Sequence, residues 1–248
     1  YARWASLFQI DGTQQYWGNK QPFSAQPPRG PWGDGRMRYE IIRPLGEFHV
    51  TYDGPLYAYD LTFSAQYPAF AYDHSAAGPE LTEPNPYFSM VWGGHFEQPM
   101  SCSGKLEIRG GPSKGQVREI SCWSHRERSW LHNFHEEKEW QRSEESVFPG
   151  HFWLILHLDD AQICALGSPQ GSRLGMPTVG AVTDAEGARP LRCVLAEIVL
   201  DESGTTAVEF RFALELADGR RIRARSTRKL GEVKLWYRGD NCLDNPVD

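Results

Sequence analysis

Short runs that alternate between apolar and polar residues constrain the fold of this chain most. In the run 57–65 the odd positions are mainly apolar and the even positions are small or polar, and 206–216 alternates in the same way. A period of two is typical of half-buried antiparallel strands. Apart from one or two helical turns expected over 132–141, no stretch has the pattern of an amphipathic helix. The sequence therefore predicts an all-β fold built as sandwiches or barrels.

A long hairpin is predicted over residues 95–130. Two alternating runs, 100–108 and 116–123, are separated by a turn that contains Gly110, Gly111, Pro112 and Gly115. Glycine takes the positive φ that such a connection requires. The hairpin would bring residues 95–98 close to residues 125–130.

The strand expected over 151–159 has two different faces. Its even positions are apolar, whereas its odd positions are His151, Trp153, Ile155 and His157. Such a strand fits the wall of a ligand-holding barrel and fits equally a strand between two packed layers. Further strands are expected over 161–166, 191–200, 206–216, 220–226 and 232–237, whereas residues 1–36, rich in Gly, Pro, Gln and Trp, are expected to be irregular.

Composition limits the partners and the compartment. The chain has 248 residues and a net charge of -6, which argues against nucleic acid as the partner. It contains no apolar run of about 18 residues, so we expect no membrane span, and its first ten residues lack a signal-peptide pattern. Five cysteines without a CxxC pair favour reduced thiols, and we predict a cytoplasmic protein.

The candidate chemistry is acid–base chemistry. The chain has no P-loop, nucleophile elbow, dinucleotide fingerprint or HExxH motif. Six of the eight histidines lie in one quarter of the chain, yet their spacing matches no zinc pattern, so we predict neither a metal nor a cofactor. Charge and burial can shift the pKa of a carboxyl group, Glu97 or Glu127, that lies beside Arg126 or Arg128 and is walled by Trp123 and Trp130. A structural salt bridge is the alternative interpretation of this cluster.

Five segments in this order resemble a known superfamily: IIRPLGEFHVTYDG, LTFSAQYPAF, HFEQPMSCSGKLEI, HRERSW and HFWLILHLDD. They are similar to the lipocalin-like superfamily that contains AttH-type proteins, carotenoid 1,2-hydratases and several fungal Diels-Alderases. The greatest similarity is to a bacterial branch with an EQ-x-G hairpin followed by a Gly-x-Arg-Asp-(His or Arg)-Ser-Trp-Gly signature. The resemblance implies two lipocalin-like β-barrel or sandwich halves, which we place at 1–110 and 111–248, with a hydrophobic pocket near the interface of the halves.

The resemblance also assigns residues. Glu97-Gln98 matches the EQ pair, and Arg126 to Trp130 match the signature from its Arg to its Trp, with Glu127 in the place of the Asp. Leu131 replaces the final Gly of the signature. Arg128 stands where carotenoid hydratases carry His, and an arginine stays protonated, so it cannot exchange a proton with an alkene. His125 can take that role.

We therefore predict a cofactor-independent enzyme that acts on a hydrophobic isoprenoid- or polyketide-like molecule, as a hydratase or dehydratase, an isomerase or a cyclase. The predicted catalytic residues are Glu127, His125, Glu97 and Arg128. The predicted ligand-binding residues are Trp123, Trp130, Arg126, Gln98, Trp153, His151 and His157. Two alternatives remain: a non-catalytic carrier of a hydrophobic ligand, and a pericyclase that acts by shape and needs no proton donor.

Overall fold

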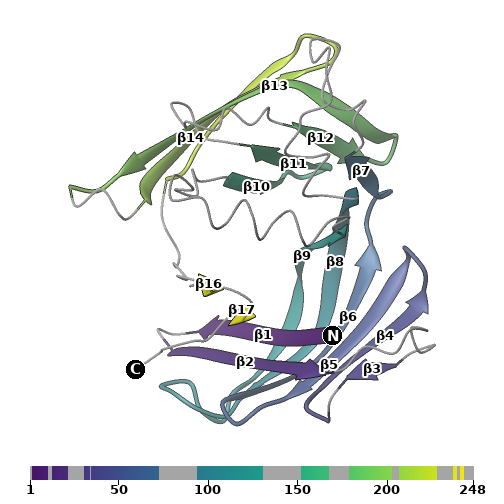
Figure 1. Cartoon of the computed structure of the whole chain (residues 1–248), viewed down its shortest axis with the longest axis vertical. Coiled ribbons are helices and arrows are strands. Elements are labelled where there is room, and N and C mark those ends of the chain that lie inside the picture. Colours follow the sequence, from purple (N-terminus) through teal and green to yellow (C-terminus); the bar gives the residue numbers. More distant parts are fainter. Residues whose placement is uncertain are drawn as a thin grey trace. The chain divides into compact units, whose positions relative to one another are not determined.

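The computed structural model describes residues 2–10, 13–21, 31–33, 35–72, 94–130, 152–167, 179–202, 207–227, 237–238 and 241–242. All the regular secondary structure within these residues is β-strand, and the strand pairs are antiparallel (Figure 1). The predicted all-β class is confirmed, as are the two large antiparallel sheets that the lipocalin-like resemblance implies. None of the described residues forms a helix that could cross a membrane.

The first large sheet has seven strands. Its order is β3-β4-β5-β6-β8-β7, with β9 paired to β8. The strands are β3 (Trp32–Gly33), β4 (Met37–Arg43), β5 (Glu47–Asp53), β6 (Tyr57–Ala65), β7 (Phe70–Tyr72), β8 (Gly94–Ile108) and β9 (Val117–Trp130).

The predicted hairpin is the pair β8–β9. At its turn the backbone N–H of Ile108 donates to the carbonyl oxygen of Gln116 at 2.9 Å. Gly111 and Gly115 take φ of 72° and 90°, which is the left-handed conformation that a side chain would disfavour. The turn residues therefore set the pairing of the two long strands, and those strands carry several of the predicted site residues.

The second large sheet has six strands that follow one another in chain order. They are β10 (Phe152–His157), β11 (Ala161–Gly167), β12 (Val179–Asp184), β13 (Gly187–Leu200), β14 (Ala207–Leu216) and β15 (Arg221–Arg225). One face carries a core that includes Phe152, Leu154, Ile163 and Leu214. The expected two-faced strand is confirmed over β10, where Phe152 and Leu154 are buried and Trp153 and His157 belong to the opposite face.

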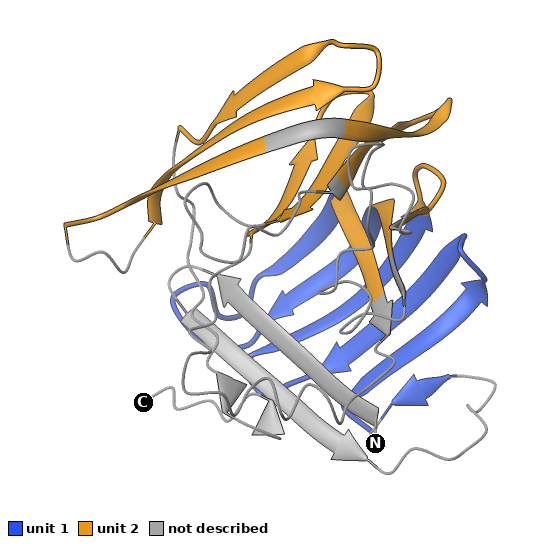
Figure 2. Cartoon of the chain, turned by 45° about the horizontal axis from the view of Figure 1, so that its top comes forward, with its two compact units in different colours: residues 1–64, 101–122, 229–248 blue, residues 65–100, 123–228 orange. Residues whose placement is uncertain are grey.

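The chain divides into two compact units (Figure 2). Unit 1 comprises residues 1–64, 101–122 and 229–248, and unit 2 comprises 65–100 and 123–228. Both β8 and β9 contribute residues to each unit. The predicted domain boundary near residue 110 falls in the β8–β9 turn within unit 1, and the two-domain division stays a prediction.

The irregular structure predicted for the N-terminus is wrong over residues 2–21. There β1 (Ala2–Ile10) and β2 (Thr13–Gln21) pair along their whole length. In the sequence an Asp-Gly dipeptide joins them, which is a strong hairpin signal, and Thr, Tyr and Trp favour strands. A last short pair is β16 (Tyr237–Arg238) with β17 (Asn241–Cys242). The helical turns expected over 132–141 lie outside the described residues.

Candidate active site

The candidate site lies in unit 2, where side chains from four strands meet. Glu97 comes from β8 and His125 from β9, whereas the second large sheet contributes Trp153 and His157 from β10 and Gln162 from β11. The two-residue period of each strand decides on which face of its sheet each of these side chains lies.

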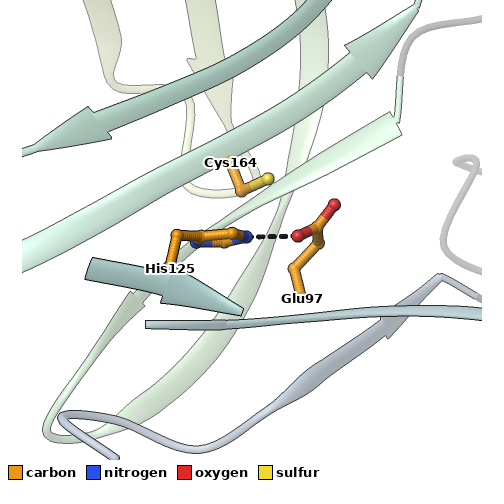
Figure 3. A group of neighbouring side chains, drawn as sticks. All are labelled: Glu97, His125 and Cys164. Carbon is orange, nitrogen blue, oxygen red and sulfur yellow. Dashed lines mark hydrogen bonds and ion pairs between the residues drawn. The ribbon is translucent and has the colours of Figure 1, made fainter. Parts of the chain in front are cut away.

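Glu97 and His125 form a buried, hydrogen-bonded pair (Figure 3). Oε2 of Glu97 is bonded to Nε2 of His125, and the two side chains are only 2% and 6% exposed. A buried carboxyl group and imidazole are stable only when they are paired, because burial without a partner carries a large desolvation penalty. The two groups of this pair would therefore carry a large desolvation penalty if either lost its partner.

Gln162 fixes the orientation of the imidazole. Its Nε2 donates to the backbone carbonyl of Ser124 at 3.4 Å and lies 3.0 Å from Nδ1 of His157. A carbonyl oxygen only accepts, so the amide nitrogen must point that way and Oε1 must point toward His125. Oε1 lies 2.6 Å from Nδ1 of His125, and Nδ1 therefore carries a proton.

This arrangement leaves one proton to be shared by Glu97 and His125. With Nδ1 protonated, Nε2 either accepts from a neutral carboxyl group or, as part of an imidazolium, donates to a carboxylate. Both states keep the same hydrogen bond. The shared proton can therefore pass between Oε2 of Glu97 and Nε2 of His125 without rearrangement of the neighbours, and a positioned group that carries a transferable proton can serve general acid–base catalysis.

Trp153 links the pair to the accessible surface. Its indole Nε1 donates to Oε1 of Glu97 at 2.9 Å, and its ring lies edge-on to the His125 ring with 5.7 Å between centroids. The residue nevertheless remains 48% exposed. An aromatic surface thus extends from the buried carboxyl group to the exterior of the unit.

His157, which is hydrogen-bonded to Gln162, also contacts Trp123. The two rings stack with 5.5 Å between centroids, and Tyr67 lies 6.4 Å beyond Trp123. Burial, reinforced by the nearby imidazole of His125, holds the pKa of His157 below its ordinary value. A neutral His157 accepts the hydrogen bond from Gln162 at Nδ1, which agrees with that direction.

The structure brings together five of the predicted site residues, namely Glu97, His125, Trp123, Trp153 and His157. Gln98 is buried next to Glu97 on β8. The guanidinium of Arg126 lies 4.9 Å from the centroid of the Phe96 ring, and Glu127 and Arg128 are exposed. His151 and the side chain of Trp130 lie outside the described residues. The roles assigned to all these residues stay predictions.

Gln162 and Cys164 were not predicted from the sequence. Both lie on β11, whose residues are all buried, and a polar residue on a fully buried strand needs a partner. That signal depends on knowing that β11 is covered on both faces. The alternation of residues 161–166 alone does not reveal it.

Glu97, His125 and Cys164 could also hold a metal ion, because one ligand atom from each lies within 4.8 Å of the others. One carboxylate, one imidazole and one thiolate form a donor set that zinc accepts. The three side chains point toward one another from different strands (Figure 3). In this structure Glu97 and His125 are hydrogen-bonded directly to each other.

A separate hollow of about 730 Å³ lies in unit 1. Its lining mixes aromatic and charged residues, among them Trp32, Arg38, Tyr59, Asp60 and Lys105. None of the predicted site residues lines it. The hollow and the buried pair are therefore distinct features.

Comparison with known proteins identifies a family. The sequence model of a family described as "Domain of unknown function (DUF7064)" matches residues 3–242. No curated protein sequence matches the chain. The crystal structure of kievitone hydratase from Nectria haematococca is similar, with a TM-score of 0.45 and 11% identity; the match covers 86% of this chain and 62% of that one. The chain thus spans less than two thirds of the length of that hydratase chain.

Proposed function

The chain belongs to the DUF7064 family, and we propose that it is an enzyme that uses Glu97 and His125 for acid–base chemistry on a hydrophobic small molecule. The observation that carries the proposal is the buried carboxyl–imidazole pair, whose two groups are hydrogen-bonded directly to each other. General acid–base catalysis of this kind accelerates a reaction by roughly 10²–10⁴-fold.

The neighbours of the pair favour an apolar substrate. On β11 Cys164 lies directly opposite Ile155 of β10 and Ala181 of β12, and directly opposed residues share a sheet face. Trp153 adds an aromatic surface that is half exposed. We infer that an isoprenoid- or polyketide-like molecule would contact this surface while its reacting carbon or oxygen approaches Glu97.

The proposed cycle conserves protons. Glu97 donates its proton to a substrate alkene or hydroxyl group, and the face of Trp153 stabilises the positive charge that develops. In a hydration, water then adds to the cation and its excess proton returns to the Glu97–His125 pair. Dehydration is the reverse, and isomerisation or cyclisation returns a proton from carbon. The pair ends as it began, so the cycle consumes no cofactor.

The test is turnover in D₂O. We would incubate the purified protein with a panel of isoprenoid and polyketide alkenes and alcohols, and detect products by liquid chromatography and mass spectrometry. A reaction that begins with protonation of an alkene leaves deuterium on carbon in the product, whereas dehydration of an alcohol does not. We expect a deuterated product from the wild type when the substrate is an alkene.

Glu97→Gln is the informative variant, because its amide can still accept from Trp153 and donate to Nε2 of His125 while it lacks the acidic proton. We expect it to bind the compound, measured by tryptophan fluorescence, and to lose turnover by roughly 10²-fold or more. Glu119→Gln, which alters an exposed ion pair between Glu119 of β9 and Lys105 of β8, is the matched control. Turnover by Glu97→Gln at the wild-type rate would refute the proposal.

Other outcomes point to the alternatives. A product without deuterium that forms equally fast in Glu97→Gln indicates cyclisation by shape, and a compound that binds tightly and is recovered unchanged indicates a carrier. Loss of turnover in Glu127→Gln, with turnover by Glu97→Gln unaffected, would identify the exposed Glu127 as the catalytic acid in place of Glu97.

A further inference from the structure

Two cysteines of unit 1 face each other across the β8–β9 pair. Two contacts show how the strands of this pair are aligned. The backbone N–H of Ile108 donates to the carbonyl oxygen of Gln116, and Nζ of Lys105 lies 3.5 Å from Oε1 of Glu119. Three positions further along each strand, this register places Cys102 opposite Cys122. The two thiols lie close enough for Cys122 to perturb Cys102, and both cysteines are free.

The two thiols have different environments. Cys102 is buried at 3% exposure, whereas Cys122 is exposed. Burial, with a contribution from the neighbouring Cys122, raises the pKa of the Cys102 thiol to about 11. A reagent in solution therefore meets Cys122 first, and Cys102 is positioned to act second.

We propose that Cys102 and Cys122 are a redox modification site that a low-molecular-weight disulfide converts reversibly into an intramolecular disulfide. The thiolate of Cys122 attacks one sulfur of the small disulfide, whose S–S bond breaks and releases one small thiol. The sulfur of Cys102 loses its proton and attacks the Cys122 sulfur of the mixed disulfide, releasing the second small thiol. The two protein thiols are oxidised, and the small disulfide is reduced to two thiols.

The backbone geometry suits this bond. Directly opposed residues of an antiparallel pair have Cα atoms about 4.5–5.5 Å apart, which lies within the range of about 4.4–6.8 Å found for disulfides. The strands therefore do not have to separate or slide. The same two strands carry Glu97 and His125, yet this inference does not depend on the proposed function.

The experiment uses the full chain in its folded state. We would incubate it with oxidised glutathione, block the remaining thiols with N-ethylmaleimide, and map the cysteines by digestion and mass spectrometry without reduction. We expect a peptide that joins Cys102 to Cys122, and its loss after treatment with dithiothreitol. Cys164, buried in unit 2, provides the internal comparison, and Cys164→Ser should form the same linked peptide.

Single substitutions separate the two steps. Cys102→Ser should stop at glutathione attached to Cys122, whereas Cys122→Ser should leave Cys102 unmodified because that thiol is buried. The exposed position makes Cys122→Ser the safer variant for folding. A wild-type protein in which Cys122 carries only glutathione, or is linked to a cysteine other than Cys102, would overturn the inference, as would a Cys102–Cys122 bond that forms only in denaturant.

Discussion

Oε1 of Gln162 lies 2.6 Å from Nδ1 of His125, so a glutamine from the second sheet decides which nitrogen of the imidazole keeps its proton. The other ring nitrogen is thereby reserved for Glu97. The amide nitrogen of Gln162 contacts the Ser124 carbonyl oxygen and Nδ1 of His157, and these two contacts prevent the side-chain amide from flipping. Gln162 thus positions the acid–base pair without being its acid or its base.

Replacing Gln162 with leucine should release the imidazole from this single tautomer. We expect ¹⁵N NMR of labelled histidine to show a mixture of tautomers for His125, and turnover to fall roughly 10-fold or more, in line with the size of acid–base effects. The buried groups that lose a partner should lower the free energy of unfolding by about 1–3 kcal/mol, measured by denaturant titration.

Gln162→Glu is the comparison for this prediction. A glutamate still accepts from Nδ1 of His125 but cannot donate to the Ser124 carbonyl, so it should keep Nδ1 protonated while it weakens the contact with Ser124. A wild-type tautomer in Gln162→Leu would show that the glutamine does not position the imidazole.

His157 should make the protein less stable in mild acid. Its pKa in the folded state lies below the ordinary value of 6.5, because it is partly buried and close to His125. Just below pH 6.5 the unfolded chain therefore binds a proton that the folded chain does not. The contribution of His157 to stability is complete above that pH and is lost as the pH falls toward the folded pKa.

His157→Gln removes this titration. Denaturation midpoints measured between about pH 7 and about pH 5 should fall less steeply for the variant than for the wild type. Identical slopes would contradict the lowered pKa. Midpoints at about pH 8, where the histidine is neutral in both states, report separately on the packing lost with the ring.

Ile163 should be a major contributor to the stability of unit 2. It is fully buried in the core of the second sheet, whereas Val208 in the same sheet is 53% exposed. Ile163→Ala should lower the free energy of unfolding by about 2–5 kcal/mol, and the matched variant Val208→Ala should change it by roughly 0.5 kcal/mol or less. Equal losses at the two positions would contradict the assignment of the core face.

The sequence was sufficient to predict most strands and the β8–β9 hairpin, because alternation and turn residues are local signals. The same local reasoning placed Trp153 and His157 on one face of β10. It did not find Gln162, since its importance comes from strands that are distant in the sequence, and it did not pair Cys102 with Cys122. That pair could have been derived by counting back from the predicted turn.

Composition alone is a poor guide to the structure of the N-terminus. Gly, Pro and Gln predict irregular structure over residues 1–36, whereas the Asp-Gly dipeptide after Ile10 is a local hairpin signal and the flanking residues do pair as strands. The identity of the buried carboxyl group was likewise beyond local reasoning. Glu97 and Glu127 were equivalent candidates in the sequence, and only the packing of the strands distinguishes the buried one from the exposed one.

The last prediction concerns a metal at the site. Zinc ligands each contact the ion at about 2.0–2.3 Å and do not share a proton with one another, whereas Glu97 and His125 are bonded directly. We therefore expect the protein purified without chelators to contain well under one equivalent of zinc by elemental analysis, and dialysis against a chelator to leave turnover in the D₂O assay unchanged. Cys164→Ala should also keep its turnover, because the proton pair does not use the thiol. One equivalent of zinc in the wild type, absent from Cys164→Ala and needed for turnover, would replace the acid–base proposal with a metal-dependent one.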